Sequence, residues 1–429
     1  MKRIFKWILL TGLALLLLLA VGVWVVQRWI GTDDFKARAE REASTTLGVA
    51  VTLSRIEVDV WPLPAVALAG VQIQTRPALT LERIEVRPAW RGLLQGRLEL
   101  ATVLVRRASL PQAGVDALLQ ALQKKKHITP VPRGPEPENT TNSHYIPRRT
   151  VLDHVTWVSA RGASMTLDAD ALLDAQGLPD DVSVKILQGQ LKGATARLLR
   201  QGNDWTVAMA VGGGTVKGTV QLQPAPKAGA PFSLKGQLET RAVEVAAVAS
   251  TAPPVLSGRL DASTTLSART ASLGALADVL QTQSKFTVRN AVVHGIDLEK
   301  AVKTVGLSRG GQTPLDTLAG QVNTQGRTVH LTNLVASSGV LSASGNVTVA
   351  PSRALSGRVS VDLAAAALGS AVAVPLAVGG TLDAPEVNLT RSALIGAALG
   401  TVVMPGVGTG AGASLGDKVG SGLKKLFGN

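Results

Sequence analysis

The sequence predicts a mainly β fold with a few helices, because alternating apolar runs recur along the chain and no alternation of strands with helices of the βαβ kind is found. Short runs in which every second residue is apolar recur along most of the chain, as at Val359, Val361 and Leu363. Such alternation gives a strand one apolar and one polar face. Apolar residues make up 45% of the chain but aromatic residues only 3%. This composition suits an open apolar surface without large rings, although an alanine-rich coding bias would produce it equally well.

The N-terminus carries a segment long enough to cross a bilayer. Ile8–Val26 is a run of 19 residues without a charged side chain, and a spanning helix needs about 20. Tryptophans, which favour the headgroup region, lie at its ends: Trp7, Trp24 and Trp29. We expect an uncleaved anchor over residues 7–28, preceded by a cytoplasmic N-terminus of residues 1–6. A cleaved signal peptide is the alternative, and the nearly balanced flanking charges do not fix the topology.

A short helix is expected over Asp33–Leu47. Thr32 can cap its first turn, and the carboxylates of Asp33 and Asp34 suit the positive end of the helix dipole. Gly48 follows as a stop signal. The apolar residues of this helix fall four apart along one side, namely Phe35, Ala39, Ala43 and Leu47.

Strands are expected in two regions, residues 32–123, which include the entry helix, and residues 150–390. In the first region the alternation changes phase at Ser54–Arg55, which predicts a bulge or turn there. Residues 124–149 are rich in Pro, Asn, Thr and Ser and lack an apolar period. We expect them to form a flexible loop that divides the body. One helical interruption is expected over Leu273–Leu280.

Residues 391–429 form a glycine-rich tail. It contains 25 consecutive uncharged residues, Ser392–Gly416. Glycines every four residues would share one helix face and permit close backbone contact; they are Gly408, Gly412, Gly416 and Gly420. We expect a helical hairpin that either lies on or in a membrane or closes the end of the sheet.

No catalytic or metal-binding constellation is found in the sequence. The chain has no Cys, and its five His residues are scattered without metal-ligand spacing. Residues 412–416 fit the G-x-S-x-G elbow of hydrolases, but no His follows to complete a triad. Residues 408–413 fit a dinucleotide fingerprint, but the chain ends before the acidic partner. We therefore expect no enzyme, no metal and no cofactor.

The net charge of +14 favours anionic partners. Aromatic residues are scarce outside the N-terminus, and no zinc-finger, RRM-like or helix-turn-helix pattern is present. We therefore expect lipid headgroups as the anionic partner and no nucleic acid.

Several short motifs occur in a recognisable order. The anchor and entry helix lead into residues 47–51 (LGVAV), and residues 90–100 (WRGLLQGRLEL) form a strand–Leu-Leu–Gly–strand element. Three more motifs follow: Gly295-Ile296-Asp297-Leu298, Thr313-Pro314-Leu315 and Gly380-Thr381-Leu382-Asp383-Ala384-Pro385. Together they resemble the AsmA family of Gram-negative envelope proteins, over most of the chain except residues 124–149.

The resemblance implies a single-pass inner-membrane protein with its bulk in the periplasm. It also implies an elongated, twisted antiparallel β-sheet that forms a groove with an apolar floor. The expected function is to bind phospholipid acyl chains there, in lipid transport or outer-membrane biogenesis. The expected partners are phospholipids, the inner membrane, the outer membrane through the tail, and an envelope protein. The candidate groove residues are Leu53, Ile56, Val58, Leu98, Leu100, Val103, Leu341, Val359 and Val361.

Other interpretations stay open at this point. Each candidate groove residue is also consistent with an ordinary sheet core. A factor that assists outer-membrane protein insertion would bind protein strands by edge pairing instead of lipid. A membrane-tethered hydrolase would require an activity that depends on Ser414.

Overall fold

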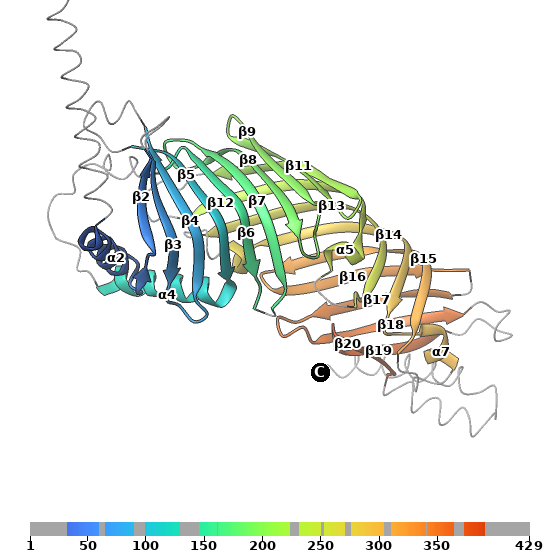
Figure 1. The fold of residues 1–429 in the computed structure, drawn as a ribbon. Coiled ribbons are helices and arrows are strands. Elements are labelled where there is room, and N and C mark those ends of the chain that lie inside the picture. Colours follow the sequence, from blue (N-terminus) through green and yellow to red (C-terminus); the bar gives the residue numbers. More distant parts are fainter. Residues whose placement is uncertain are drawn as a thin grey trace, which may run out of the picture. The chain divides into compact units, whose positions relative to one another are not determined.

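The computed structural model describes residues 32–59, 65–89, 99–128, 146–160, 162–223, 231–249, 253–270, 276–303, 310–339, 341–363 and 373–390. Within them, twenty strands form one open, mostly antiparallel sheet with a few helices (Figure 1). The predicted mainly β class is confirmed. The predicted anchor and glycine-rich tail lie outside the described residues. Among the helices that are described, none combines the length and the apolar character needed to span a membrane.

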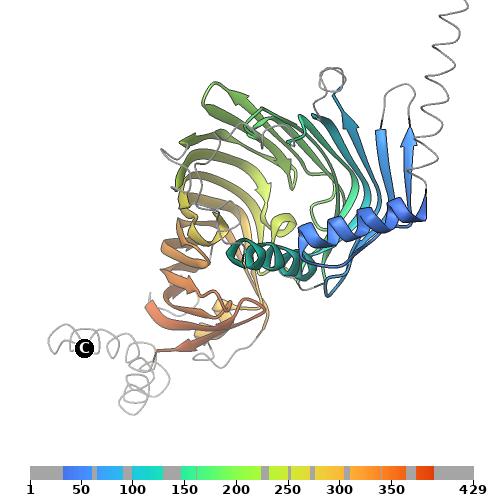
Figure 2. The ribbon, with the colours of Figure 1, turned by 90° about the vertical axis from the view of Figure 1, so that its left-hand side faces the viewer.

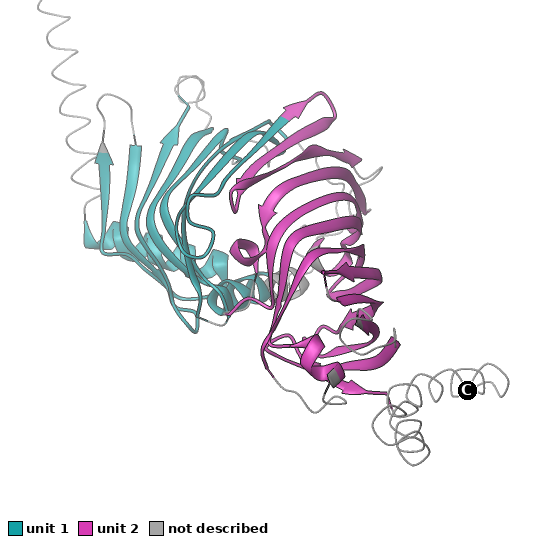
Figure 3. Ribbon diagram, turned by 90° about the vertical axis from the view of Figure 1, so that its right-hand side faces the viewer, with its two compact units in different colours: residues 1–199 teal, residues 200–429 magenta. Residues whose placement is uncertain are grey.

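The chain divides into two compact units, residues 1–199 and 200–429 (Figure 3). Unit 1 carries helices α2, Asp33–Leu47, and α4, Gln112–Ile128. Its strands are β1 Val51–Thr52, β2 Arg55–Asp59, β3 Ala65–Ile73, β4 Leu79–Pro88, β5 Leu100–Pro111, β6 Arg149–Val158, β7 Ser164–Leu173, β8 Pro179–Gln188 and β9 Thr195–Gln201, which reaches the boundary between the units.

Helix α2 follows the sequence prediction closely. The backbone N–H of Phe35 donates to Oγ1 of Thr32 at 3.4 Å, and Gly48 ends the helix with a left-handed φ of 72°. The apolar side of α2 packs onto a core of Val51, Leu53, Ile56 and Val71. Figure 2 shows α2 (blue) and α4 (teal) next to each other against the strands of unit 1. The helices therefore cover the apolar face of the first strands.

The predicted break at Ser54–Arg55 is confirmed. β1 and β2 are separate strands that both pair with β3, and Leu53–Ser54 lie between them. Gly70 stands opposite with a φ of 59°, where a Cβ atom would collide with the Ser54 side chain. The carboxylate of Glu40 on α2 accepts a hydrogen bond from the freed N–H of Leu53 at 2.7 Å. The break thus ties the entry helix to the sheet.

The chain between β5 and β6 differs from the expected divider loop. Residues 124–128 belong to α4, so the predicted start of the loop was wrong; residues 129–145 lie outside the described part. β5 and β6 pair in parallel, with Thr102 opposite Arg149. Parallel neighbours need a crossover of a dozen or more residues, usually with a helix. The segment is therefore a crossover within unit 1, and the units divide elsewhere, between Leu199 and Arg200.

Unit 2 is a simple antiparallel meander in which each strand pairs with the next along the chain. Of the predicted helix at residues 273–280, the structure shows α6; residues 271–275 are outside the described part.

The helices of unit 2 are α5 Val245–Val248, α6 Leu276–Val279 and α7 Leu298–Lys303. Its strands are β10 Asp204–Val211, β11 Gly214–Gln223, β12 Phe232–Glu244, β13 Leu256–Thr270, β14 Gln281–His294, β15 Gln312–Gln325, β16 Thr328–Ser337, β17 Leu341–Val349, β18 Leu355–Leu363, β19 Ala373–Thr381 and β20 Ala384–Leu389.

Bulged residues in the left-handed conformation interrupt strands of both units. Three of them are His154, Ala242 and Asn333, with φ between 51° and 54°. Each donates its N–H to a side chain of the next strand, at 2.8 to 2.9 Å: Asp168, Asp261 and Asn346, respectively. A left-handed residue costs roughly 1–2 kcal/mol, and a bulge bends and twists its strand. The side-chain acceptors offset that cost where the strands bend.

Unit 2 has its own closed core at its last strands. Val361 and Leu376 are fully buried, and Val288 is 1% exposed. Helix α7 packs against β15 and β18 and contributes the buried Ala301 and Val302. This end of unit 2 is therefore a helix-covered core, like the first strands of unit 1.

Candidate functional site

The candidate site is an apolar face in the middle of unit 2. The strand register places Leu222 opposite Leu234, and Gly236 opposite Leu266. Residues 234 and 236 are two apart on β12, so all four residues lie on one face of the sheet. We call it the central apolar face. It comprises Val216, Val220, Leu222, Leu234, Leu238 and Leu266, all of them half-buried. The residues that alternate with them on β12, such as Lys235, Gln237 and Glu239, are exposed.

The structure divides the predicted groove residues into different environments. Leu53 and Ile56 are buried in the core under α2, and Leu341 and Val361 in the core near α7. Val58, Val103 and Val359 are half-buried. Leu100 follows a register shift in the β4–β5 pair, and Leu98 lies outside the described residues. The tryptophans of the predicted anchor and the glycines of the tail also lie outside them.

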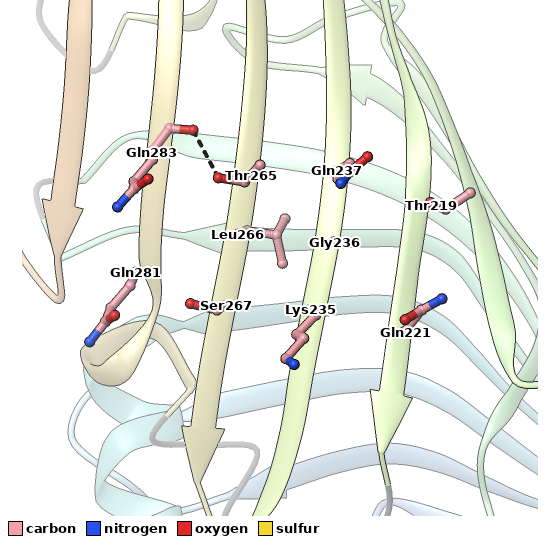
Figure 4. A pocket seen from close by; sticks show the side chains of 10 residues that line it. All are labelled: Thr219, Gln221, Lys235, Gly236, Gln237, Thr265, Leu266, Ser267, Gln281 and Gln283. Atoms are coloured by element: carbon pink, nitrogen blue, oxygen red, sulfur yellow. Dashed lines mark hydrogen bonds between the residues drawn. The ribbon is translucent and has the colours of Figure 1, made fainter.

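A shallow hollow lies on the opposite, polar face of the same strands (Figure 4). Its volume is about 490 Å³, and polar side chains dominate its lining, with Leu266 as an apolar exception. Thr265 Oγ1 donates to the carbonyl of Gln283 at 3.4 Å within it. Among the described residues that line it, Lys235 is the one that carries a charge. Amides and hydroxyls can hydrogen-bond a polar ligand, but this hollow does not suit an acyl chain.

Three of the short sequence motifs meet in unit 2. The hydroxyl of Thr313 donates to the carbonyl of Ile296 at 2.8 Å and accepts the N–H of Leu298 at 3.0 Å. A Cβ on Gly295 would lie 3.1 Å from Pro385 Cγ, so the first and third motifs are packed together. Asp297 accepts the N–H of Lys300 in the first turn of α7 at 2.8 Å. The motifs therefore hold α7 over the core, a structural role that their spacing in the sequence did not reveal.

The structure brings His154 together with two carboxylates. Its Nδ1 lies 2.6 Å from Asp153 Oδ1 and 3.6 Å from Asp168 Oδ1. The hydrogen bond to Asp153, followed by the charges of both carboxylates, raises the pKa of His154. The three ligand atoms lie within 4.8 Å of one another. Asp168 already accepts the His154 N–H, and Arg106 Nε is 3.7 Å from Asp153. We therefore assign the cluster to the β6 bulge.

Charged side chains form a network on the polar face of unit 1. Glu85, whose side chain is 7% exposed, accepts hydrogen bonds from Arg83 at 2.8 Å and from Arg87 at 3.1 Å. Arg83 also bonds Glu57 at 2.7 Å. Burial favours a higher pKa for Glu85, but the bonds from Arg83 and Arg87 and the charge of Arg106 together lower it. The network covers this part of the sheet with paired charges.

No protein family model, no curated protein and no solved structure matches the chain. Comparison with known proteins therefore assigns no function to this geometry. The description of the fold and of the central apolar face rests on the contacts given above.

Proposed function

We propose that this chain binds phospholipid acyl chains on the central apolar face, as an AsmA-like protein of the cell envelope that takes part in lipid transport or outer-membrane biogenesis. The observation that carries the proposal is a set of aliphatic side chains that share one sheet face across β11–β13 and remain half-buried. Soluble proteins rarely leave contiguous apolar patches uncovered unless they bind something there.

The chemistry of the face favours acyl chains over flat or charged ligands. Its six residues are Val and Leu. The neighbouring ring on this sheet face, Trp205 opposite Val220, is buried, and the Arg200 guanidinium lies over it at 5.4 Å from the ring centroid. Each methylene group of an acyl chain that leaves water for such a surface contributes roughly 0.8 kcal/mol. A single tail can therefore be held without a catalytic residue, a metal or a cofactor.

The sequence supplies the cellular setting of the proposal. The apolar run at residues 8–26 would anchor the chain in the inner membrane, and the resemblance to the AsmA family would put the body in the periplasm. Phospholipids would be the ligands, and membranes or an envelope protein would supply and accept them.

Site-specific photocrosslinking in cells tests the proposal with the full chain. A benzophenone amino acid replaces Leu238 on the central apolar face, and Gln237 on the opposite face of the same strand is the matched control. In cells grown with radioactive phosphate, we expect a labelled lipid adduct at position 238 and not at position 237. Equal or absent labelling at both positions would overturn the proposal. An adduct with a polypeptide instead would support a factor that assists outer-membrane protein insertion.

A further inference from the structure

Four hydroxyl side chains interrupt the apolar face of unit 2 beside the central apolar face. The register places Thr264 opposite Ser284 and Thr282 opposite Thr324, on the adjoining strands β13, β14 and β15. Leu266 is the register partner of Thr282, and Leu238 that of Thr264. The four hydroxyls therefore share a face with leucines, and all four residues are half-buried. We call this set the hydroxyl island.

The hydroxyls bond one another in two pairs. Thr264 Oγ1 lies 2.8 Å from Ser284 Oγ, and Thr282 Oγ1 is hydrogen-bonded to Thr324 Oγ1. Thr324 Oγ1 also accepts the N–H of Thr282 at 3.1 Å. Each pair contains two O–H donors and uses one of them in the mutual bond. Each pair thus retains one O–H donor that has no acceptor among the described residues.

The charge around the island determines which ligand group it can take. Lys235 pairs with Ser267 and Lys285 with Ser263, so both lysines lie on the opposite face. A phosphate beside the island would be a half-buried charge with both of these lysines on the other side of the sheet, which is unfavourable. A neutral carbonyl oxygen accepts a hydroxyl hydrogen bond without that cost. Thr282 and Ser284 are two residues apart on β14, so the two hydroxyl pairs are separated by about 7 Å along the strand.

We propose that the hydroxyl island binds the ester carbonyls of a diacyl lipid whose tails lie on the central apolar face. This inference rests on the proposed lipid binding and adds its specificity: the ligand is a diacyl ester, and the island fixes where its glycerol backbone lies. The tails supply affinity without a preferred position, whereas the two O–H donors recognise two acceptors on neighbouring carbons.

The test compares ester and ether lipids on the purified full chain that carries the benzophenone at position 238. A labelled diacyl phospholipid is crosslinked in the presence of unlabelled diacyl or dialkyl-ether phospholipid with the same headgroup and chain length. Two neutral hydrogen bonds predict that the diacyl lipid competes about tenfold better. We expect the variant with Thr264→Val, Ser284→Ala, Thr282→Val and Thr324→Val to bind both lipids equally, while Thr265→Val on the opposite face keeps the preference.

The outcomes separate this inference from the proposed function. If the ether and ester lipids compete equally well against the wild-type chain, the island has no role and lipid binding stands. The same holds if the fourfold variant keeps the preference. If neither lipid competes, both proposals are wrong. If the fourfold variant does not fold, two pairwise variants decide the question. Thr264→Val with Ser284→Ala, and Thr282→Val with Thr324→Val, each remove one hydroxyl pair with its free donor, and each is expected to reduce the preference about threefold.

Discussion

The apolar face under α2 and the central apolar face of unit 2 have the same strand pattern but different surroundings. Leu53 and Ile56 are 6% and 8% exposed because α2 lays its apolar side on them. Leu234 and Leu238 alternate with polar residues in the same way, yet they are half-buried. Alternation thus determines which face of a strand is apolar, and the presence of a covering helix determines whether that face is a core.

The largest expected effect separates a closed core from the central face. Leu376→Ala removes a fully buried side chain and should lower the free energy of unfolding by about 3 kcal/mol. Leu238→Ala should cost less than about 1 kcal/mol, because its side chain is already partly in water. Urea unfolding of the full chain, followed by circular dichroism, measures both. Equal losses would mean that the central apolar face is a closed core after all.

The charged network of unit 1 gives the next effect. Glu85→Gln removes the buried carboxylate that accepts hydrogen bonds from Arg83 and Arg87 and should destabilise unit 1 by about 2 kcal/mol. The pKa of Glu85 is lowered on folding, so its stabilisation is complete above the unfolded pKa of about 4.3 and is lost as the pH falls through the folded value. The wild-type advantage should therefore shrink in acid. Gln237→Glu, at an exposed position on the polar face of unit 2, is the control and should change stability little.

A smaller effect concerns the contact between α2 and the break in the first strands. Glu40→Ala removes the acceptor of the Leu53 N–H and should cost about 1 kcal/mol. Hydrogen exchange should accelerate at the Leu53 amide and remain unchanged at amides in unit 2. Unchanged exchange at Leu53 would show that α2 holds the closed face by apolar packing alone.

The smallest effect is a pH dependence at the bulge of β6. His154→Asn keeps a side chain that tolerates the left-handed conformation but removes the imidazolium between Asp153 and Asp168. The pKa of His154 is raised on folding, so its contribution is complete below the unfolded pKa of about 6.5 and disappears as the pH rises through the folded value. The difference in melting temperature between wild type and variant should be greatest near pH 6 and vanish at alkaline pH. A difference that does not depend on pH would assign the effect to bulge geometry.

The sequence predicted local structure well where a short-range signal exists. Thr32 and Gly48 marked both ends of α2, and the phase change at Ser54–Arg55 marked the break between β1 and β2. The helix at the start of the predicted loop was missed, although Val115, Leu118 and Leu122 have helical spacing. The parallel pairing of β5 and β6 leaves no such signal, because strand direction depends on the crossover.

The candidate site was predictable only in kind. Period-two alternation identified apolar faces, but nothing local indicates that Leu341 and Val361 lie in a core near α7 while Leu234 and Leu266 do not. The same limit applies to the hydroxyl island, since Thr264 and Ser284 are 20 residues apart and meet only through strand register. His154 and Asp168 likewise come together through pairing of β6 with β7.

The neighbour-only pairing of β10 to β20 has a consequence for how such proteins change in evolution. Each strand from β11 to β19 exchanges its backbone hydrogen bonds with the preceding and following strands of the meander, so an inserted or lost hairpin would alter the pairing at the site of the change and leave the other registers intact. Strand direction is also preserved when two strands are added together. The length of unit 2 can therefore vary by whole hairpins without redesign of its ends, much as a repeat protein changes its number of modules.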